Sequence, residues 1–107
     1  MFDHYYIYIL ASKRNGTLYV GFTTNLLRRI QEHKNKEIEG FTKKYNVENL
    51  VYYEIVEGFI EAVRREKQIK KWNRAWKMRL IEENNPKWKD LYEDFVKEQE
   101  KLPKCYL

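Results

Sequence analysis

The distribution of apolar residues along the chain predicts three β-strands. Residues 5–10 consist only of tyrosine, isoleucine and leucine, and strands are enriched in aromatic and β-branched residues. The turn signal Asn15-Gly16 separates this run from a second one at residues 17–22, so we expect the two strands to pair antiparallel. Because two strands alone are only marginally stable, a third run at residues 50–56 is needed to complete the sheet.

A spacing of three and four residues between apolar positions predicts helices elsewhere. Leu26 and Ile30 share the inward face of a helix expected from about residue 24 to 35, and a Thr-Thr-Asn cluster suits its start. The strand before this helix is expected to end at a glycine. Residues 34–46 are polar, with Gly40 in their middle, and we expect a loop there.

After the third strand the pattern is helical again. The apolar spacing begins at Phe59, and Asn73 is placed to cap a further helix, which Pro86 ends. Residues from Trp88 to Phe95 then predict a last amphipathic helix.

These elements define an α/β (α+β) fold, a three-stranded antiparallel sheet flanked by helices. The order is strand, strand, helix, strand, helix, helix, followed by a C-terminal helix. A chain of 107 residues has room for one domain with a modest core. We expect the main domain over residues 1–83 and a helical extension over residues 84–107 packed on it.

Composition narrows the class of protein. The net charge is +5, and no apolar run approaches the length of a membrane span. The N-terminus lacks the pattern of a signal peptide, and the single cysteine, Cys105, cannot form an internal disulfide. We therefore expect a cytoplasmic protein without a membrane partner.

The positive charge is concentrated in one segment. Residues 64–79 carry eight lysines and arginines against the single carboxylate of Glu66, with Trp72 and Trp76 among them. This combination suits a nucleic acid as partner, although a solvated helix face has the same pattern. The candidate nucleic-acid-binding residues are Arg65, Lys70, Lys71, Arg74 and Lys77.

Three charged or titratable residues fall where apolar ones are expected. Arg29 and His33 lie on or beside the inner face of the first helix, and Glu66 interrupts the apolar face of the helix that begins at Phe59. A buried carboxylate needs a cation or a metal beside it. A salt bridge to Arg29 or to a neighbouring lysine is the structural alternative.

Two tripeptides connect these residues to a family. Tyr6-Ile7-Tyr8 and Tyr19-Val20-Gly21, separated by ten residues, resemble the paired tripeptides of the GIY-YIG endonuclease domain. The positions of Arg29, His33 and Glu66 also match that family, as do the basic and tryptophan-containing runs of its small stand-alone members. The similarity covers about residues 4–82, and it extends to the nuclease domain of an excision-repair endonuclease.

The resemblance implies a metal-dependent endonuclease that hydrolyses DNA phosphodiester bonds in repair or recombination. It assigns catalytic roles to Tyr8, Tyr19, Arg29 and His33, with Tyr8 as the base. Glu66 would hold Mg²⁺ or Mn²⁺, and no other cofactor is implied.

The chain departs from the family pattern in two places. Tyr6 replaces the first glycine, and the family's active-site asparagine has three candidates, Asn73, Asn84 and Asn85.

The chemistry of the residues agrees with this assignment. Arginine binds a phosphate through two hydrogen bonds from its planar guanidinium group, and a carboxylate is a suitable ligand for a hard cation such as Mg²⁺. A phenol titrates near ~10, so the base role of Tyr8 requires positive charge nearby. An unperturbed imidazole titrates near neutral pH, so His33 is also a candidate for relaying a proton.

Each assignment has an alternative. Tyr8 and Tyr19 can be packing partners across two strands, and His33 can be a cation at a helix C-terminus. The whole chain can be a DNA-binding module without catalysis, or a protein-interaction domain that uses Trp72, Trp76 and Trp88. The nuclease hypothesis requires Tyr8, Tyr19, Arg29 and Glu66 to meet in one surface cleft, with both helices on the same face of the sheet.

Overall fold

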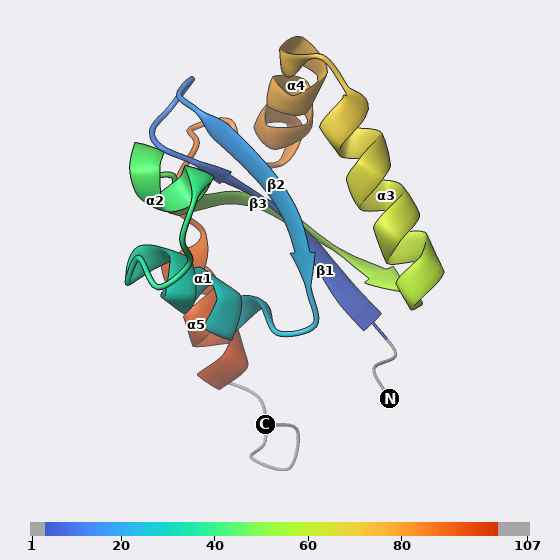
Figure 1. Ribbon diagram of the computed structural model, residues 1–107, viewed down its shortest axis with the longest axis horizontal. Helices are drawn as coiled ribbons and strands as arrows, with labels where there is room; N and C mark the ends of the chain where they lie inside the picture. Colours follow the sequence, from blue (N-terminus) through green and yellow to red (C-terminus); the bar gives the residue numbers. More distant parts are fainter. Residues whose placement is uncertain (1–3, 101–107) are drawn as a thin grey trace.

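The computed structural model describes residues 4–100 of the chain. Its sheet has three antiparallel strands, β1 (His4–Ala11), β2 (Leu18–Thr23) and β3 (Asn49–Glu57), in the order β2-β1-β3. The central position belongs to β1, and β2 forms one edge (Figure 1). The predicted antiparallel α+β fold is confirmed.

Both faces of the sheet are covered, which explains the unbroken burial of β1 from Ile7 to Ala11. Ile7 and Ile9 point into one apolar cluster, whereas Tyr8 and Leu10 point into another. This alternation is the two-residue period of a strand, and each face therefore has its own core.

Five helices are divided between the two faces (Figure 1). The helices on the Tyr8 face are α1 (Leu26–Lys34), α2 (Phe41–Tyr45) and α5 (Tyr92–Glu100). Those on the Ile7 face are α3 (Phe59–Lys71) and α4 (Arg74–Asn84). Leu26, Ile30 and Phe95 are buried on the first face, and Ala62, Ile69 and Ile81 on the second.

Three sequence-based expectations are corrected by the structure. The second strand, expected at residues 17–22, is observed as Leu18–Thr23, so Gly21 lies inside β2 and is not its last residue. The expected loop at residues 34–46 contains the short helix α2, which is too short for a helical period to be visible in the sequence. Trp88 precedes the last helix instead of belonging to it.

Trp88 is instead a core residue in a turn. Its backbone is left-handed, with φ 57°, its ring is buried, and its Nε1 donates to Glu82 Oε2 over 2.9 Å. It therefore anchors the connection between α4 and α5, and it is not available to a protein partner. In the part of the chain that the structure describes, no helix combines the length and apolar character needed to cross a membrane.

Candidate functional site

A buried hydrogen-bonded chain of three side chains lies between the sheet and α1. The Tyr8 hydroxyl is 3.2 Å from His33 Nε2, and His33 Nδ1 is 3.0 Å from Thr42 Oγ1. All three side chains are buried. The chain therefore connects the central strand β1, the end of α1 and the helix α2.

Local sequence explains how the three residues meet. His33 lies three residues after Ile30 and seven after Leu26, on the inner face of α1. Thr42 is positioned by α2, which ends at Asn46 in the left-handed conformation, and Val47 N–H donates to Thr42 O over 2.9 Å. Thr42 was not found from the sequence. The available signal was Asn46, a residue type common at left-handed helix ends.

Burial keeps His33 neutral. Its removal from water lowers the pKa of His33 from the usual 6.5 to about 4, and the positive charge of Arg29 lowers it further, against the opposing effect of Glu32. A neutral imidazole has one donor and one acceptor nitrogen, which matches its two hydroxyl partners. Burial and two hydroxyl partners favour this neutral role over the cationic helix cap that the sequence left open.

The Tyr8 phenol is protonated at neutral pH. Burial is the largest cause that raises the pKa of Tyr8, and Tyr19, Glu66 and Glu32 raise it as well, whereas the charge of Arg29 lowers it. A base role for Tyr8 therefore needs more positive charge than Arg29 supplies.

Gly21 makes room for the Tyr8 hydroxyl. Tyr8 is the register partner of Gly21, and a Cβ atom at position 21 would lie 2.7 Å from the Tyr8 oxygen and 3.1 Å from Tyr19 Cε2. The Tyr19 ring lies 6.3 Å from the Tyr8 ring and 5.6 Å from the His33 ring, between centroids. Tyr19 is thus a diagonal neighbour of Tyr8 and not its directly opposite partner.

Arg29 is accessible to a phosphate, but it shares the Glu32 carboxylate with Arg28. Its side chain is 43% exposed, and its Nε lies 3.6 Å from Glu32 Oε1, while Arg28 Nε lies 3.2 Å from Glu32 Oε2. Two guanidinium groups and one carboxylate leave a net positive site. The start of α1 encloses a pocket of about 180 Å³ lined by Thr23, Thr24, Asn25, Arg28, Arg29 and Glu32.

Glu66 lies on α3, with only 15% of its side chain exposed, and its partner is Lys70 Nζ at 3.3 Å. The salt bridge to a neighbouring lysine, which the sequence left open, is therefore present. Since α1 and α3 cover opposite faces of the sheet, the expectation that both helices lie on one face is wrong. The charges of Arg29 and Glu66 nevertheless both act on the Tyr8 phenol, which lies over Gly21 of the edge strand β2.

The available side-chain ligands suit a cation that keeps most of its bound waters. They do not suit a metal that is fully coordinated by protein groups. Within residues 4–100, no group of three or more histidine, cysteine, aspartate or glutamate side chains is placed to hold a metal. Mg²⁺ needs only one or two carboxylates and keeps several waters, so Glu66 satisfies it once Lys70 is displaced.

The predicted nucleic-acid-binding residues differ in whether their side chains already have partners within the protein. Arg65 donates two hydrogen bonds to Glu54, of 2.8 and 3.0 Å, and Arg74 donates to the carbonyl oxygens of Asn15 and Gly16 at the β1–β2 turn. Lys70 is held by Glu66, whereas Lys71 is exposed and makes no ion pair within the described residues.

Lys77, the remaining member of that set, lines a pocket of about 280 Å³ beside the β1–β2 turn. Arg74, Thr17 and Leu18 form its other walls.

The three candidate asparagines have structural partners. Asn73 caps α4 by accepting from Trp76 N, and Asn84 donates to Leu80 O within its own helix. Asn85 is buried and donates to Val51 O and Lys89 O. Their hydrogen bonds are accounted for by the fold.

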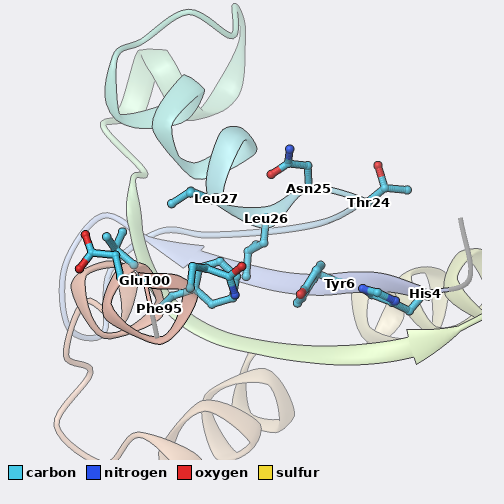
Figure 2. Close-up of a pocket in the computed structure, with 10 residues that line it drawn as sticks. His4, Tyr6, Thr24, Asn25, Leu26, Leu27, Phe95 and Glu100 are labelled. Carbon is cyan, nitrogen blue, oxygen red and sulfur yellow. The ribbon is translucent and has the colours of Figure 1, made fainter. Parts of the chain in front are cut away.

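A separate pocket of about 530 Å³ opens between the start of β1, the start of α1 and α5. Figure 2 shows Tyr6, Leu26 and Phe95 along it, with Glu100 at the end of α5. None of the predicted catalytic side chains lines it.

Comparison with known proteins places the chain in a family. The sequence matches the profile described as the GIY-YIG catalytic domain over residues 4–80. It is 40% identical over 80 residues to a UPF0213 protein of Syntrophus aciditrophicus, covering 74% of this chain and 91% of that one. A UPF0213 protein of Staphylococcus saprophyticus is 38% identical over 81 residues, with coverages of 76% and 98%.

A solved structure agrees with the fold. The solution NMR structure of a UPF0213 protein from Bacillus halodurans aligns with a TM-score of 0.51 and 28% identity, over 81% of this chain and 92% of that one. The matched region contains both tripeptides together with Arg29, His33 and Glu66. The chain therefore belongs to the GIY-YIG family.

Proposed function

We propose that this protein is a metal-dependent endonuclease that hydrolyses phosphodiester bonds in DNA. The observation that carries the proposal is the environment of Tyr8. Its hydroxyl lies against Gly21 of the edge strand and within hydrogen-bond distance of His33 Nε2, and Arg29 and Glu66 shift the pKa of this phenol in opposite directions. All of these residues fall within the region that matches the GIY-YIG catalytic domain.

Each residue has a defined part in this proposal. Arg29 binds the scissile phosphate and neutralises the charge that develops on it. Tyr8 orients the attacking water through its hydroxyl, and His33 and Thr42 hold that hydroxyl in place through their hydrogen bonds. Tyr19 packs against both Tyr8 and His33 and restricts their rings.

The metal fits Glu66. A divalent cation supplies Lewis-acid stabilisation of a phosphoryl oxygen and positive charge near Tyr8. The chain contributes the carboxylate, and Lys70, which is 49% exposed, can leave it at small cost. Mg²⁺ is the expected ion, with Mn²⁺ as a substitute.

DNA binding is assigned to the basic surface of α3 and α4. Lys70, Lys71 and Lys77 are its expected phosphate contacts, and Arg65 and Arg74 support the surface through their bonds to Glu54 and to the β1–β2 turn. We place the activity in DNA repair or recombination in the cytoplasm.

Two observations favour a second function, a DNA-binding module without catalysis. Lys70 occupies the proposed metal ligand Glu66, and the Tyr8 phenol is strongly biased to its neutral form. Both features would persist unchanged in a protein that never binds a metal.

A single cleavage experiment separates the two functions. The protein is incubated with nicked, flapped, branched, linear and single-stranded DNA, with Mg²⁺ or Mn²⁺ and in parallel with EDTA. Metal-dependent cleavage that disappears with EDTA and with Glu66→Gln supports the endonuclease. Retarded but uncut DNA in every reaction supports the binding module.

A further inference from the structure

Two tryptophans form an aromatic corner where α3 meets α4. The Trp72 and Trp76 rings have centroids 6.0 Å apart and are inclined at 75°. With Arg79, Leu80 and Glu83 they line an open pocket of about 300 Å³. It lies where α3 is followed by α4, two helices that are neighbours in Figure 1. Trp76 is 52% exposed, a large aromatic surface for water to cover. We call these five residues the tryptophan corner.

The tryptophan corner is held rigidly. Trp72 ends α3, and the guanidinium of Arg65 lies 5.4 Å from its ring centroid. Arg65 is itself fixed by its two hydrogen bonds to Glu54 of β3. The first turn of α4, which carries Trp76, is fixed by the Asn73 cap at 2.9 Å. A fixed aromatic surface loses little entropy when a ligand stacks on it.

The charge around the corner selects the kind of ligand. Residues 70–79 contain five lysines and arginines and no aspartate or glutamate. Arg79 lines the pocket with the two rings and Lys71 directly precedes Trp72, and both are exposed, while Glu83 is the one acidic residue that lines the pocket. An exposed aromatic ring surrounded by cations complements a ligand with flat apolar groups on an anionic backbone.

We propose that the tryptophan corner binds unpaired nucleotides, with a base stacked on Trp76 and the adjoining phosphates paired with Lys71 and Arg79. This inference rests on the proposed function and specifies its substrate class, DNA that contains a single-stranded segment. Trp72 follows Glu66 by six residues, or about 9 Å along the helix axis. The Trp76 ring lies 6.0 Å from the Trp72 ring between centroids, so the proposed stacking site is within a few nucleotide lengths of Glu66.

The test measures binding without cleavage. Fluorescence anisotropy with a labelled oligothymidylate and with a blunt hairpin duplex of equal charge is recorded in EDTA at one salt concentration. Trp76→Ala should weaken oligothymidylate binding by about tenfold or more and leave the duplex affinity unchanged. Trp76→Phe should retain most of the single-strand affinity, because a phenyl ring still stacks.

A matched control is Tyr45, which is 48% exposed on α2 and also sits beside another aromatic ring, that of Phe41. Tyr45→Ala should leave the oligothymidylate affinity as in the wild type. Equal losses on single strand and duplex with Trp76→Ala, or no loss on either, would overturn the inference. So would a change of self-association in sedimentation without a change in DNA affinity, since the corner would then join two copies.

Failure of the inference and failure of the proposed function give different results. If the protein binds oligothymidylate through Trp76 but never cuts DNA, the proposed activity is wrong. The proposed nucleotide binding at the tryptophan corner then stands. If the protein cuts DNA in the presence of Mg²⁺ but Trp76→Ala binds oligothymidylate as tightly as the wild type does, the proposed activity stands. The proposed nucleotide binding at the tryptophan corner is then wrong.

Discussion

The hydroxyl of Tyr8 lies in the space that a side chain at position 21 would occupy, directly across from it in the β1–β2 pair. Gly21→Ala would place a methyl group 2.7 Å from that oxygen. Tyr8 must then move, and we expect a loss of about 1–3 kcal/mol in the free energy of unfolding. Cleavage should fall by about 10²-fold, because a displacement of this size misplaces the reacting groups.

Urea unfolding and cleavage rates of the same preparation measure both effects. A double-mutant cycle tests the cause: in a Tyr8→Leu background, the stability cost of Gly21→Ala should largely disappear. A cost that is the same in both backgrounds would mean that Gly21 is required for the strand itself and not for Tyr8.

His33 makes stability depend on pH in a defined window. Its pKa is lowered from 6.5 when unfolded to about 4 when folded, so between these values the unfolded chain binds more protons. The contribution of a neutral His33 is complete above pH 6.5 and decreases as the pH falls toward 4, by up to about 3 kcal/mol.

Urea unfolding at several pH values between 4 and 7 measures this slope. His33→Gln, which keeps hydrogen-bonding groups and does not titrate, should flatten the curve within the window. His4→Gln, at an exposed position in β1, should keep the wild-type slope. An equal slope in wild type and His33→Gln would show that other groups control the acid response.

Thr42 is expected to position His33. Thr42→Val leaves the buried His33 Nδ1 without its 3.0 Å partner, at a cost of about 1–3 kcal/mol. Thr42→Ser keeps the hydroxyl and should restore most of the cleavage rate. The pH dependence of cleavage distinguishes positioning from simple destabilisation: it should shift in Thr42→Val when measured well below the melting temperature, and not in Thr42→Ser.

The basic surface should divide into supporting and binding residues. Arg65→Ala removes both hydrogen bonds to Glu54 and should lower the free energy of unfolding by about 1–3 kcal/mol. Lys71→Ala touches no ion pair in the described residues and should leave stability unchanged. Its effect should appear in the salt dependence of DNA binding, where losing one phosphate contact lowers the log–log slope by about 0.9. An unchanged slope would mean that Lys71 is only a solvated residue.

Local patterns were enough for most of the fold. The strand-forming runs and the caps at Asn25 and Asn73 were visible in the sequence, because each depends on neighbours along the chain. The face of the sheet that each helix covers was not visible. Periodicity shows that Glu66 and Arg29 both point inward, but it does not say toward which side of the sheet.

The site was predictable only as far as the family motifs extend. The motifs singled out Tyr8, Tyr19, Arg29, His33 and Glu66 as candidates, whereas Thr42 was missed because α2 is only five residues long. The partners of Arg65 could not be predicted either. Glu54 lies eleven residues away on β3, and a contact of that kind depends on how a helix is seated on the sheet.

Glu66→Gln is the decisive test of catalysis. The variant keeps the size of the side chain and removes the charge that a hard cation needs. If Glu66 holds the metal, cleavage should fall by orders of magnitude while DNA binding is retained, because metal stabilisation of phosphoryl charge contributes several kcal/mol to lowering the barrier.

The partner seen in the structure makes this test sharper. Lys70 is 49% exposed, so the loss of its pair with Glu66 should cost less than about 1 kcal/mol and barely change the melting temperature. Lys70→Met serves as the control for the ion pair, since it breaks the same pair and leaves the carboxylate free for a cation. Because Lys70 is also an expected phosphate contact, cleavage by this variant is compared at saturating DNA. We therefore expect Glu66→Gln to abolish cleavage and Lys70→Met to retain metal-dependent cleavage, with similar melting temperatures measured on the same samples. If Glu66→Gln melts well below the wild type and still cleaves DNA at the wild-type rate, the carboxylate is structural and the metal must be bound elsewhere.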